Sequence, residues 1–330
     1  MGFFGFLKKR KADGPAGDDG STPASAGLDA YERLELLGRG GMGEVWRSRR
    51  ASDGAIVAVK IIRVEATDDA EKLDIRVERF RREAQATAKL TSPHAIRIYD
   101  HGGTADGGFY YAMELLEGLD LDKLVLRHGR VREARLVYLL SQACHALGEA
   151  HRAGIVHRDI KPDNLFVSPT DHLKVLDFGL VKLVEQGSTG EQFDRGNLRA
   201  LTSTTQSLGT PAFMAPEQIR AGQAIDHRAD VYALGCVAYF ALTATPVFEG
   251  SLDTQLMFAH ISADPDPPSK RLGKIVHPSV EAVVLRCLEK EPDARYQTMD
   301  ELGEALAAIK LPRSWNADRA AAWWQEHAAG

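Results

Sequence analysis

Apolar and polar positions follow two different patterns along the chain. Between residues 31 and 113, apolar residues gather in the short runs 31–38, 44–50, 55–64, 96–101 and 109–113, separated by turn signals rich in Gly, Asp and Ser. Such runs predict strands, and the first three predict an antiparallel meander around a glycine-rich turn. From about 70 to 90, apolar residues recur every three or four positions, which predicts one amphipathic helix.

Helical spacing dominates the rest of the chain. An apolar stripe runs from Leu136 to Ala150 and stops at Gly154, and helical patterns continue from about 216 to 310. Two short strand-like pieces, 165–167 and 173–176, lie between them. The predicted fold class is therefore α+β and bilobal, with a small antiparallel-sheet N-lobe (31–113) that carries one key helix. A hinge (114–118) would lead to a larger, mainly helical C-lobe (119–310).

The two ends of the chain lie outside this pattern. Residues 1–28 begin with MGFFGFLKKRK and continue with Gly, Ala, Ser, Pro and Asp, which predicts a flexible tail and linker. The order of apolar and basic residues is the reverse of a secretory signal, and Phe6 breaks the myristoylation pattern. A weak contact of this segment with a membrane surface stays open. Residues 311–330 hold three of the four tryptophans, which favours packing on the C-lobe, with a peptide-docking role as the alternative.

Composition and charge narrow the function classes. Forty-one Lys and Arg against 46 Asp and Glu give a net charge of −5, which offers no electrostatic reason to expect nucleic-acid binding. The longest stretch without charges, 231–248, contains Gly, Thr and Pro and predicts a buried core helix rather than a transmembrane span. Three separated cysteines, Cys144, Cys236 and Cys287, form neither a disulfide framework nor a zinc motif. We therefore expect a cytoplasmic protein with no transmembrane segment.

The first candidate for chemistry is the turn between the first two strands, whose sequence is GRGGMGEV (38–45). A dinucleotide-binding fold would need a helix after the glycines, whereas residues 44–50 have strand character. The loop therefore joins two strands, and its backbone can approach phosphate groups without a Cβ in the way. A plain hairpin turn is the alternative if this motif is taken alone.

A lysine and a glutamate follow this turn. Lys60 ends the apolar run VAVK, where it faces inward and needs an anion, and Glu83 on the predicted helix is the natural partner. An ordinary strand end, with the lysine head reaching water, is the alternative.

The strongest block is HRDIKPDN (157–164), followed by DFG (177–179). Asn164 and Asp177 supply the kind of oxygen ligands that Mg²⁺ prefers together with phosphate and water. Asp159 can accept a proton from an incoming hydroxyl, and Lys161 can neutralise charge on a moving phosphoryl group. Further along, APE (215–217) closes a long segment.

Together and in this order, the motifs resemble those of a eukaryotic-type protein kinase domain, over residues 31–310. The resemblance implies that Val45, Ala58 and Phe166 enclose adenine, that Met113 is the gatekeeper, and that the hinge backbone bonds the base. The residues that it assigns to ATP binding are Leu37, Gly38, Arg39, Gly40, Gly41, Met42, Gly43, Glu44, Val45, Ala58, Lys60, Met113, Glu114, Leu116 and Phe166.

The same resemblance implies the catalytic roles. Asp159 would be the base, assisted by Lys161, while Lys60 paired with Glu83 would hold the α- and β-phosphates. Asn164 and Asp177 would hold Mg²⁺ or Mn²⁺. Structural support would come from His157, Phe178, Thr210, Glu217, Asp230 and Arg295. Within that set, Glu217 would pair with Arg295, and Asp230 would brace the catalytic loop.

Two details indicate the class of kinase. Lys161 in DIKP and the run GTP (209–211) resemble the Ser/Thr class, and LGTPAFMAPEQ (208–218) is similar to bacterial Hanks-type kinases. The resemblance implies transfer of the ATP γ-phosphoryl group to Ser/Thr hydroxyls of protein substrates, with a transient kinase–kinase dimer. Many such kinases continue into a transmembrane helix and a sensor domain, which these 330 residues do not contain. A pseudokinase scaffold and a small-molecule kinase of the aminoglycoside type are the alternatives.

A regulatory site is expected before GTP (209–211). Arg158 places a cation beside Asp159, and the segment 202–205 reads TSTT. A phosphate there carries about −1.5 to −2 charges and can pair with Arg158. We therefore expect autophosphorylation at Thr202 or Thr204, with a solvated, flexible loop as the alternative.

Overall fold

The computed structural model describes residues 27–40, 43–63, 81–82, 84–104, 107–178, 211–220 and 222–327. Contacts divide the chain into two compact units. The first unit contains the residues before 67 together with Ile98–Leu115, and the second contains residues 67–97 and the chain from Leu116 onward. Each unit has its own buried apolar core.

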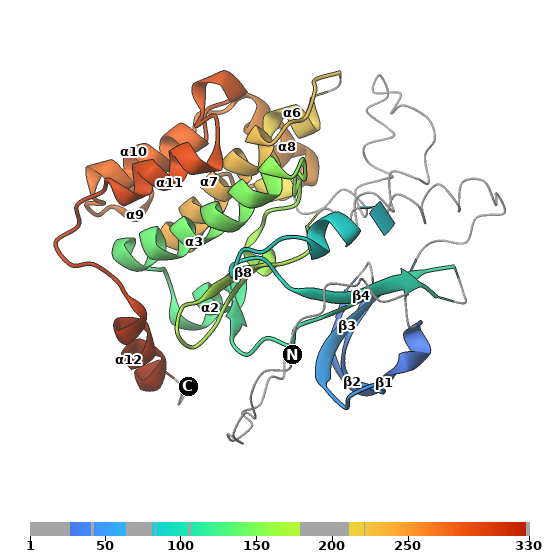
Figure 1. The fold of residues 1–330 in the computed structure, drawn as a ribbon. Helices are drawn as coiled ribbons and strands as arrows, with labels where there is room; N and C mark the ends of the chain where they lie inside the picture. Colours follow the sequence, from blue (N-terminus) through green and yellow to red (C-terminus); the bar gives the residue numbers. More distant parts are fainter. Residues whose placement is uncertain are drawn as a thin grey trace. The chain divides into compact units, whose positions relative to one another are not determined.

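The first unit is an antiparallel sheet (Figure 1) of five strands in the order β1-β2-β3-β5-β4. Its elements are η1 (Leu28–Ala30), β1 (Tyr31–Gly40), β2 (Gly43–Arg50), β3 (Ile56–Ile62), β4 (Ile98–Gly103) and β5 (Phe109–Met113). The predicted meander and the later strand pair are both confirmed. A core of Tyr31, Val57, Val59, Tyr110 and Ala112 holds one face of the sheet.

The register of the strands decides which side chains share a face. Val45 is opposite Lys60, and Ala58 is opposite Met113. Because directly opposed residues point the same way and residues two apart share a face, these four side chains line one face of the sheet. Glu44 is the neighbour of Val45 in β2 and therefore lies on the other face.

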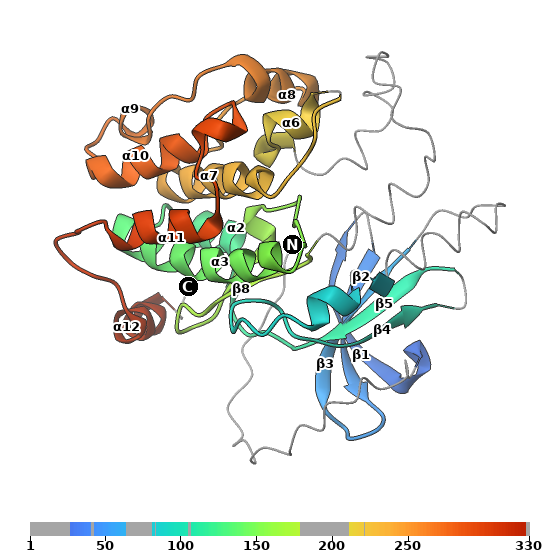
Figure 2. The same cartoon turned by 45° about the horizontal axis from the view of Figure 1, so that its top comes forward.

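The second unit is mainly helical (Figure 2). Its helices are α2 (Leu121–His128), α3 (Glu133–Arg152), α6 (Pro216–Ile219), α7 (Arg228–Thr243), α8 (Asp253–Ser262), α9 (Pro268–Leu272), α10 (Pro278–Cys287), α11 (Met299–Ala307) and α12 (Ala317–His327). Short 3₁₀ turns are η2 (Pro162–Asn164), η3 (Pro211–Phe213) and η4 (Pro292–Ala294), and a small antiparallel sheet contains β6 (Leu119–Asp120), β7 (Leu165–Val167) and β8 (Leu173–Val175). Of the helix predicted over 70–90, residues 81–82 and 84–88 are described, and they are helical.

Helix α7 forms the centre of the second unit. Its residues are buried almost without exception, as the uncharged stretch predicts. The helix stops at Thr243 because Ala244 adopts a left-handed conformation (φ 58°) two residues before Pro246. Among the helices in the described part of the chain, none has the length and apolar character needed to cross a membrane.

Residues 91–97 contact the helical unit, although the sequence analysis assigns this stretch to the N-lobe. Glu149 of α3 accepts hydrogen bonds from the backbone N–H groups of Thr91 (2.8 Å) and Ser92 (2.6 Å). Ala95 then forms a parallel bridge to Val175 of β8. These backbone bonds join residues 91–97 to the second unit, with which they are grouped.

Candidate active site

The loop between α3 and β7 brings two predicted catalytic side chains and one predicted metal ligand together. The Lys161 Nζ lies 3.0 Å from Asp159 Oδ2. The Asn164 amide donates to the backbone carbonyl of Asp159 at 2.8 Å and to its Oδ2 at 3.2 Å. Burial alone would lower the pKa of Lys161, but the attraction of Asp159 outweighs it and raises that pKa. Lys161 is therefore cationic at neutral pH, 3.0 Å from the Asp159 side chain.

Asp230, at the start of α7, holds the backbone of this loop through hydrogen bonds. Its carboxylate accepts hydrogen bonds from the backbone N–H of His157 (2.8 Å), the backbone N–H of Arg158 (2.7 Å) and His151 Nε2 (2.8 Å). The Asp230 side chain is fully buried. Burial would raise its pKa, yet the hydrogen bonds and the electrostatic effect of the neighbouring His151 and His157 lower the pKa below its usual value. The brace is thus an ionised carboxylate under the catalytic loop.

Two residues of this region have strained backbones. Arg158 (φ 62°) and Asp177 (φ 54°) both adopt the left-handed region, which costs about 1–3 kcal/mol per residue and persists only where the surroundings enforce it. The bond to Asp230 holds Arg158. Next to Asp177, the Leu176 carbonyl bonds His157 Nε2 at 2.7 Å, and the buried Phe178 ring packs 5.2 Å from the His157 ring.

The hairpin β7–β8 carries both predicted metal ligands at its open end. Asn164 directly precedes β7, Asp177 follows β8 by two residues, and the Leu176 N–H donates to the Asn164 carbonyl at 2.9 Å. Because the Asn164 nitrogen bonds Asp159, its side-chain oxygen is the atom left to meet a cation. An amide oxygen and a carboxylate suit Mg²⁺ or Mn²⁺.

The APE segment is anchored in the core of the helical unit. Glu217 and Arg295 form a bidentate ion pair, with N–O distances of 2.7 and 2.8 Å. Gln218 accepts from the Ala215 N–H (3.0 Å) and donates to the Arg158 carbonyl (2.9 Å), which ties this segment to the catalytic loop. The sequence analysis gave no role to Gln218, which it quoted only as the end of the run 208–218, nor to His151, which belongs to no motif.

In the first unit, the glycines of the predicted phosphate loop differ in their surroundings. Gly43 has φ 150°, and a Cβ there would lie 1.9 Å from the Ile61 carbonyl oxygen, so the fold itself requires glycine. At Gly38 and Gly40, an added Cβ would meet nothing within 4 Å among the described residues. The space beside these two glycines would accept a ligand that a side chain would obstruct. Lys60, on the same sheet face as Val45, has its Nζ 5.9 Å from the centre of the Tyr111 ring.

On the opposite face of this hairpin, the Glu44 carboxylate accepts hydrogen bonds from three side chains, as Asp230 does from three donors in the second unit. Glu44 Oε1 accepts from Arg63 (2.7 Å) and pairs with Arg39 (3.0 Å), and Glu44 Oε2 accepts from Trp46 Nε1 (3.0 Å). The bond from Trp46 and the two arginines lower the pKa of Glu44. The sequence analysis placed Glu44 and Arg39 in the ATP-binding loop and missed this role, since Arg63 lies 19 residues away.

The remaining predicted site residues fall into two groups. In the described part, Leu37 lies in β1, Glu114 and Leu116 lie in the connection after β5, and Phe166 lies in β7 opposite Lys174. Outside the described residues are Gly41, Met42, Glu83, Thr202, Thr204 and Thr210.

Comparisons with known proteins agree with this geometry. The family model of the protein kinase domain matches residues 31–305. The serine/threonine-protein kinase pkn3 of Myxococcus xanthus is 36% identical over 86% of this chain and 50% of its own length. The serine/threonine-protein kinase PknB is 40% identical in Mycolicibacterium smegmatis and 39% in Mycobacterium tuberculosis, in each case over 85% of this chain and 43% of the relative.

Solved structures are similar as well. A crystal structure of Rad53 1-466 in complex with AMP-PNP matches with a TM-score of 0.66 and 25% identity, over 85% of this chain and 66% of the other. The chain spans about half the length of the curated relatives. The antiparallel sheet, the helical unit and the family match over most of the sequence lead to one conclusion: the chain belongs to the protein kinase domain family.

Proposed function

We propose that this protein is a serine/threonine protein kinase that transfers the γ-phosphoryl group of ATP to hydroxyls of protein substrates. The observation that carries the proposal is the half-buried arrangement around Asp159. Lys161 and Asn164 both contact that residue, and Asp230 fixes the backbone on its N-terminal side. The two bacterial relatives named as serine/threonine-protein kinases support the choice of substrate class.

In this mechanism, the substrate hydroxyl oxygen attacks the γ-phosphorus while the bond from that phosphorus to the β–γ bridging oxygen breaks. Asp159 orients the hydroxyl and accepts its proton, and ADP leaves with the bridging oxygen. Lys161, held 3.0 Å from Asp159, neutralises negative charge on the transferred group. Asp159 cannot turn away easily, because Asn164 and Lys161 both bond its carboxylate.

ATP binding is supported by the first unit and by the AMP-PNP complex of the Rad53 structure. The space beside Gly38 and Gly40 suits phosphate groups, and Lys60 would contact the α- and β-phosphates. Val45, Ala58 and Met113, which share the face of Lys60, would surround the base. A divalent cation on Asn164 and Asp177 would supply neutralisation of the phosphate charge.

The proposal extends to location and to regulation. A cytoplasmic, reducing environment is supported by Cys144, Cys236 and Cys287, which are buried free thiols. A phosphate on Thr202 or Thr204 would pair with Arg158 and order the segment before APE. Such autophosphorylation would proceed through a transient dimer, in which one copy is the substrate of the other.

Phosphosite mapping by mass spectrometry, after incubation with Mg-ATP and a mixed protein substrate, tests the proposal. We expect phosphate on Ser and Thr, including Thr202 or Thr204, and none when EDTA is in excess. A pseudokinase scaffold would give no phosphate in any arm, and a small-molecule kinase would turn over ATP only with a small acceptor.

The Thr202→Ala/Thr204→Ala variant separates regulation from catalysis. We expect lower activity than in the wild type, with the same sites modified in the substrate. Full activity in this variant, or no phosphate on 202–207 in the wild type, would refute the regulatory part and leave the catalytic assignment intact.

A further inference from the structure

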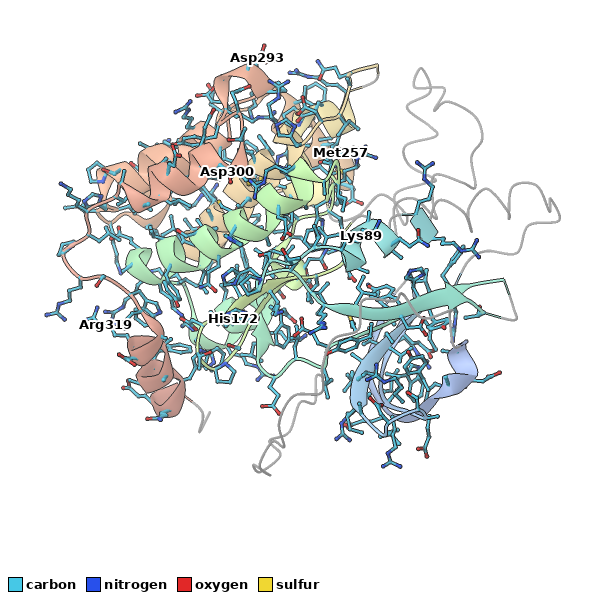
Figure 3. All side chains as sticks on the ribbon, in the orientation of Figure 1. Lys89, His172, Met257, Asp293, Asp300 and Arg319 are labelled. Carbon is cyan, nitrogen blue, oxygen red and sulfur yellow. The ribbon has the colours of Figure 1, made fainter. Side chains whose placement is uncertain are left out.

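The tryptophan-rich end of the chain binds one turn of the helical unit. After α11, an extended connection leads to α12, which lies beside the β7–β8 turn in both ribbon views. Trp315 Nε1 donates to Asp171 Oδ2 at 2.8 Å, and Trp324 Nε1 donates to Asp171 Oδ1 at 2.7 Å. Asp171 is the residue between the two strands of this hairpin that adopts φ 53°. Figure 3 labels its neighbour His172 and, on α12, Arg319.

The same carboxylate also binds a buried arginine. Arg135 of α3 donates from Nε and Nη2 to the two Asp171 oxygens, both at 2.7 Å. The side chains of Arg135 and Asp171 are 5% and 0% exposed. The Arg135 guanidinium lies 3.8 Å from the centre of the Trp323 ring, in the range of a strong cation–π contact. The tail thus covers a charged pair and supplies two of its hydrogen bonds.

The position of Asp171 gives this contact its functional meaning. Asp171 is at the closed end of the β7–β8 hairpin, and the proposed metal ligands Asn164 and Asp177 are at the open end. Only three residue pairs join the two strands, so the hairpin is short. A shift of its closed end therefore also shifts the residues at its open end. A hairpin of this size depends on contacts with other elements for a fixed geometry.

We propose that Trp315 and Trp324 are positioning residues: by anchoring Asp171, they hold the β7–β8 hairpin in the geometry that sets Asn164 and Asp177 for the divalent cation. This inference rests on the proposed function, because it assumes that these two residues bind the metal. Gln142 of α3 supports the same turn by bonding the Asp171 carbonyl (2.9 Å) and the Leu173 N–H (2.9 Å). Asp171 is therefore held by hydrogen bonds from both α3 and the tail.

Hydrogen exchange on the protein without nucleotide or metal gives a readout that is independent of activity. The reporter amides are Val175, which donates to the His94 carbonyl, and Leu176, which donates to the Asn164 carbonyl. In the Trp315→Phe/Trp324→Phe variant, which loses the two indole donors to Asp171 and keeps those of Arg135, we expect these amides to exchange about tenfold faster, with α7 amides unchanged. Trp323→Phe is the matched control, since it keeps an aromatic ring over Arg135 and both indole bonds to Asp171.

Metal affinity is the second readout. Electron paramagnetic resonance would measure Mn²⁺ binding in the presence of saturating AMP-PNP. We expect the double variant to bind Mn²⁺ about three- to tenfold more weakly than the wild type and the Trp323→Phe control to stay within about twofold.

Three results would overturn the inference. The first is amide exchange that rises in α7 as much as in Val175 and Leu176, because the tail would then stabilise the whole unit. The others are exchange and Mn²⁺ affinity that change equally in the Trp323→Phe control, and no change of either in the double variant. Asp177→Asn distinguishes this failure from failure of the proposed function. If Asp177→Asn loses Mn²⁺ binding and phosphotransfer while the double variant matches the wild type, only the tail inference is wrong. If Asp177→Asn keeps both, the metal assignment itself is wrong.

Discussion

Asp230 in the second unit and Glu44 in the first each accept hydrogen bonds from three donors, and the surroundings of these two carboxylates differ. Asp230 is fully buried and binds two backbone N–H groups and a histidine. Glu44 binds Trp46 and two arginines whose side chains are 66% and 69% exposed. A buried carboxylate that bonds backbone fixes the path of the chain, whereas ion pairs with exposed side chains are weak and easily rearranged.

The difference matches the tasks that we propose for the two regions. The catalytic loop must hold Asp159 in one geometry, and the strained φ of Arg158 persists because Asp230 bonds its N–H. The glycine-rich hairpin must admit ATP and release ADP, and ion pairs whose arginine side chains are exposed, around a buried Glu44, can open for this purpose. Between the two carboxylates, the comparison predicts a larger effect for a change of Asp230 than for a change of Glu44.

The largest effect is expected for Asp159→Asn. The amide cannot accept the proton of the hydroxyl, and a positioned base contributes about 10²–10⁴-fold to the rate. Phosphotransfer measured with radiolabelled ATP should fall by that factor, while binding of AMP-PNP in a calorimeter stays unchanged. Wild-type turnover in this variant would show that the base has been assigned wrongly.

Lys60→Met tests the phosphate contact in the first unit. Methionine keeps the length of the side chain and removes its charge, so phosphate positioning is lost and activity should fall by about 10²-fold. The Lys270→Met variant, which removes an exposed lysine of α9, is the control and should match the wild type. Equal activity of the two variants would exclude a requirement for Lys60 and for its predicted pairing with Glu83.

Asp230→Asn tests the brace directly. The amide leaves one of the buried donors without an acceptor, so the free energy of unfolding should fall by about 1–3 kcal/mol, and kcat should fall by about tenfold as Asp159 shifts. Denaturant unfolding and steady-state kinetics measure the two effects. A loss of stability with an unchanged kcat would mean that Asp230 supports the fold and does not position the loop.

The pH dependence of the free energy of unfolding, compared between the wild type and Asp230→Asn, tests whether the charge of Asp230 stabilises the fold. The folded pKa of Asp230 is lowered, so its charge adds stability above the unfolded pKa of about 3.9, and this contribution is lost as the pH falls through the folded value. The stability difference between the wild type and Asp230→Asn should therefore be constant from pH 7 to about 5 and shrink below about 4. A constant difference down to pH 3 would contradict the role of the charge.

The smallest effect is expected for Glu44→Gln. The amide oxygen can still accept from Trp46, and only the charge toward Arg39 and Arg63 is lost. We expect KM for ATP to rise by no more than about fivefold, with kcat unchanged. A fall in kcat as large as that expected for Asp230→Asn would remove the contrast between the two regions.

Much of the catalytic machinery could be inferred from the sequence because it is local in the chain. The segments 157–164 and 177–179 have fixed spacings, and the strands 31–40 and 43–50 flank a glycine-rich turn. Short-range patterns of this kind specify turns, strands and the order of chemical groups without knowledge of the packing. Glu217 and Arg295 were paired from the resemblance alone, although 78 residues separate them.

Other features depended on contacts that no local pattern encodes. Three sets of bonds show this: those from His151 and Gln218 to the catalytic region, that from Arg63 to Glu44, and those from Trp315 and Trp324 to Asp171. They join residues 19 to 153 positions apart in the sequence. The sequence by itself determined the elements, the order of the motifs and the aromatic character of the tail. Only the tertiary structure decided which buried carboxylate each donor meets, because hydrogen-bond partners are chosen by the packing of helices and strands that lie far apart in the chain.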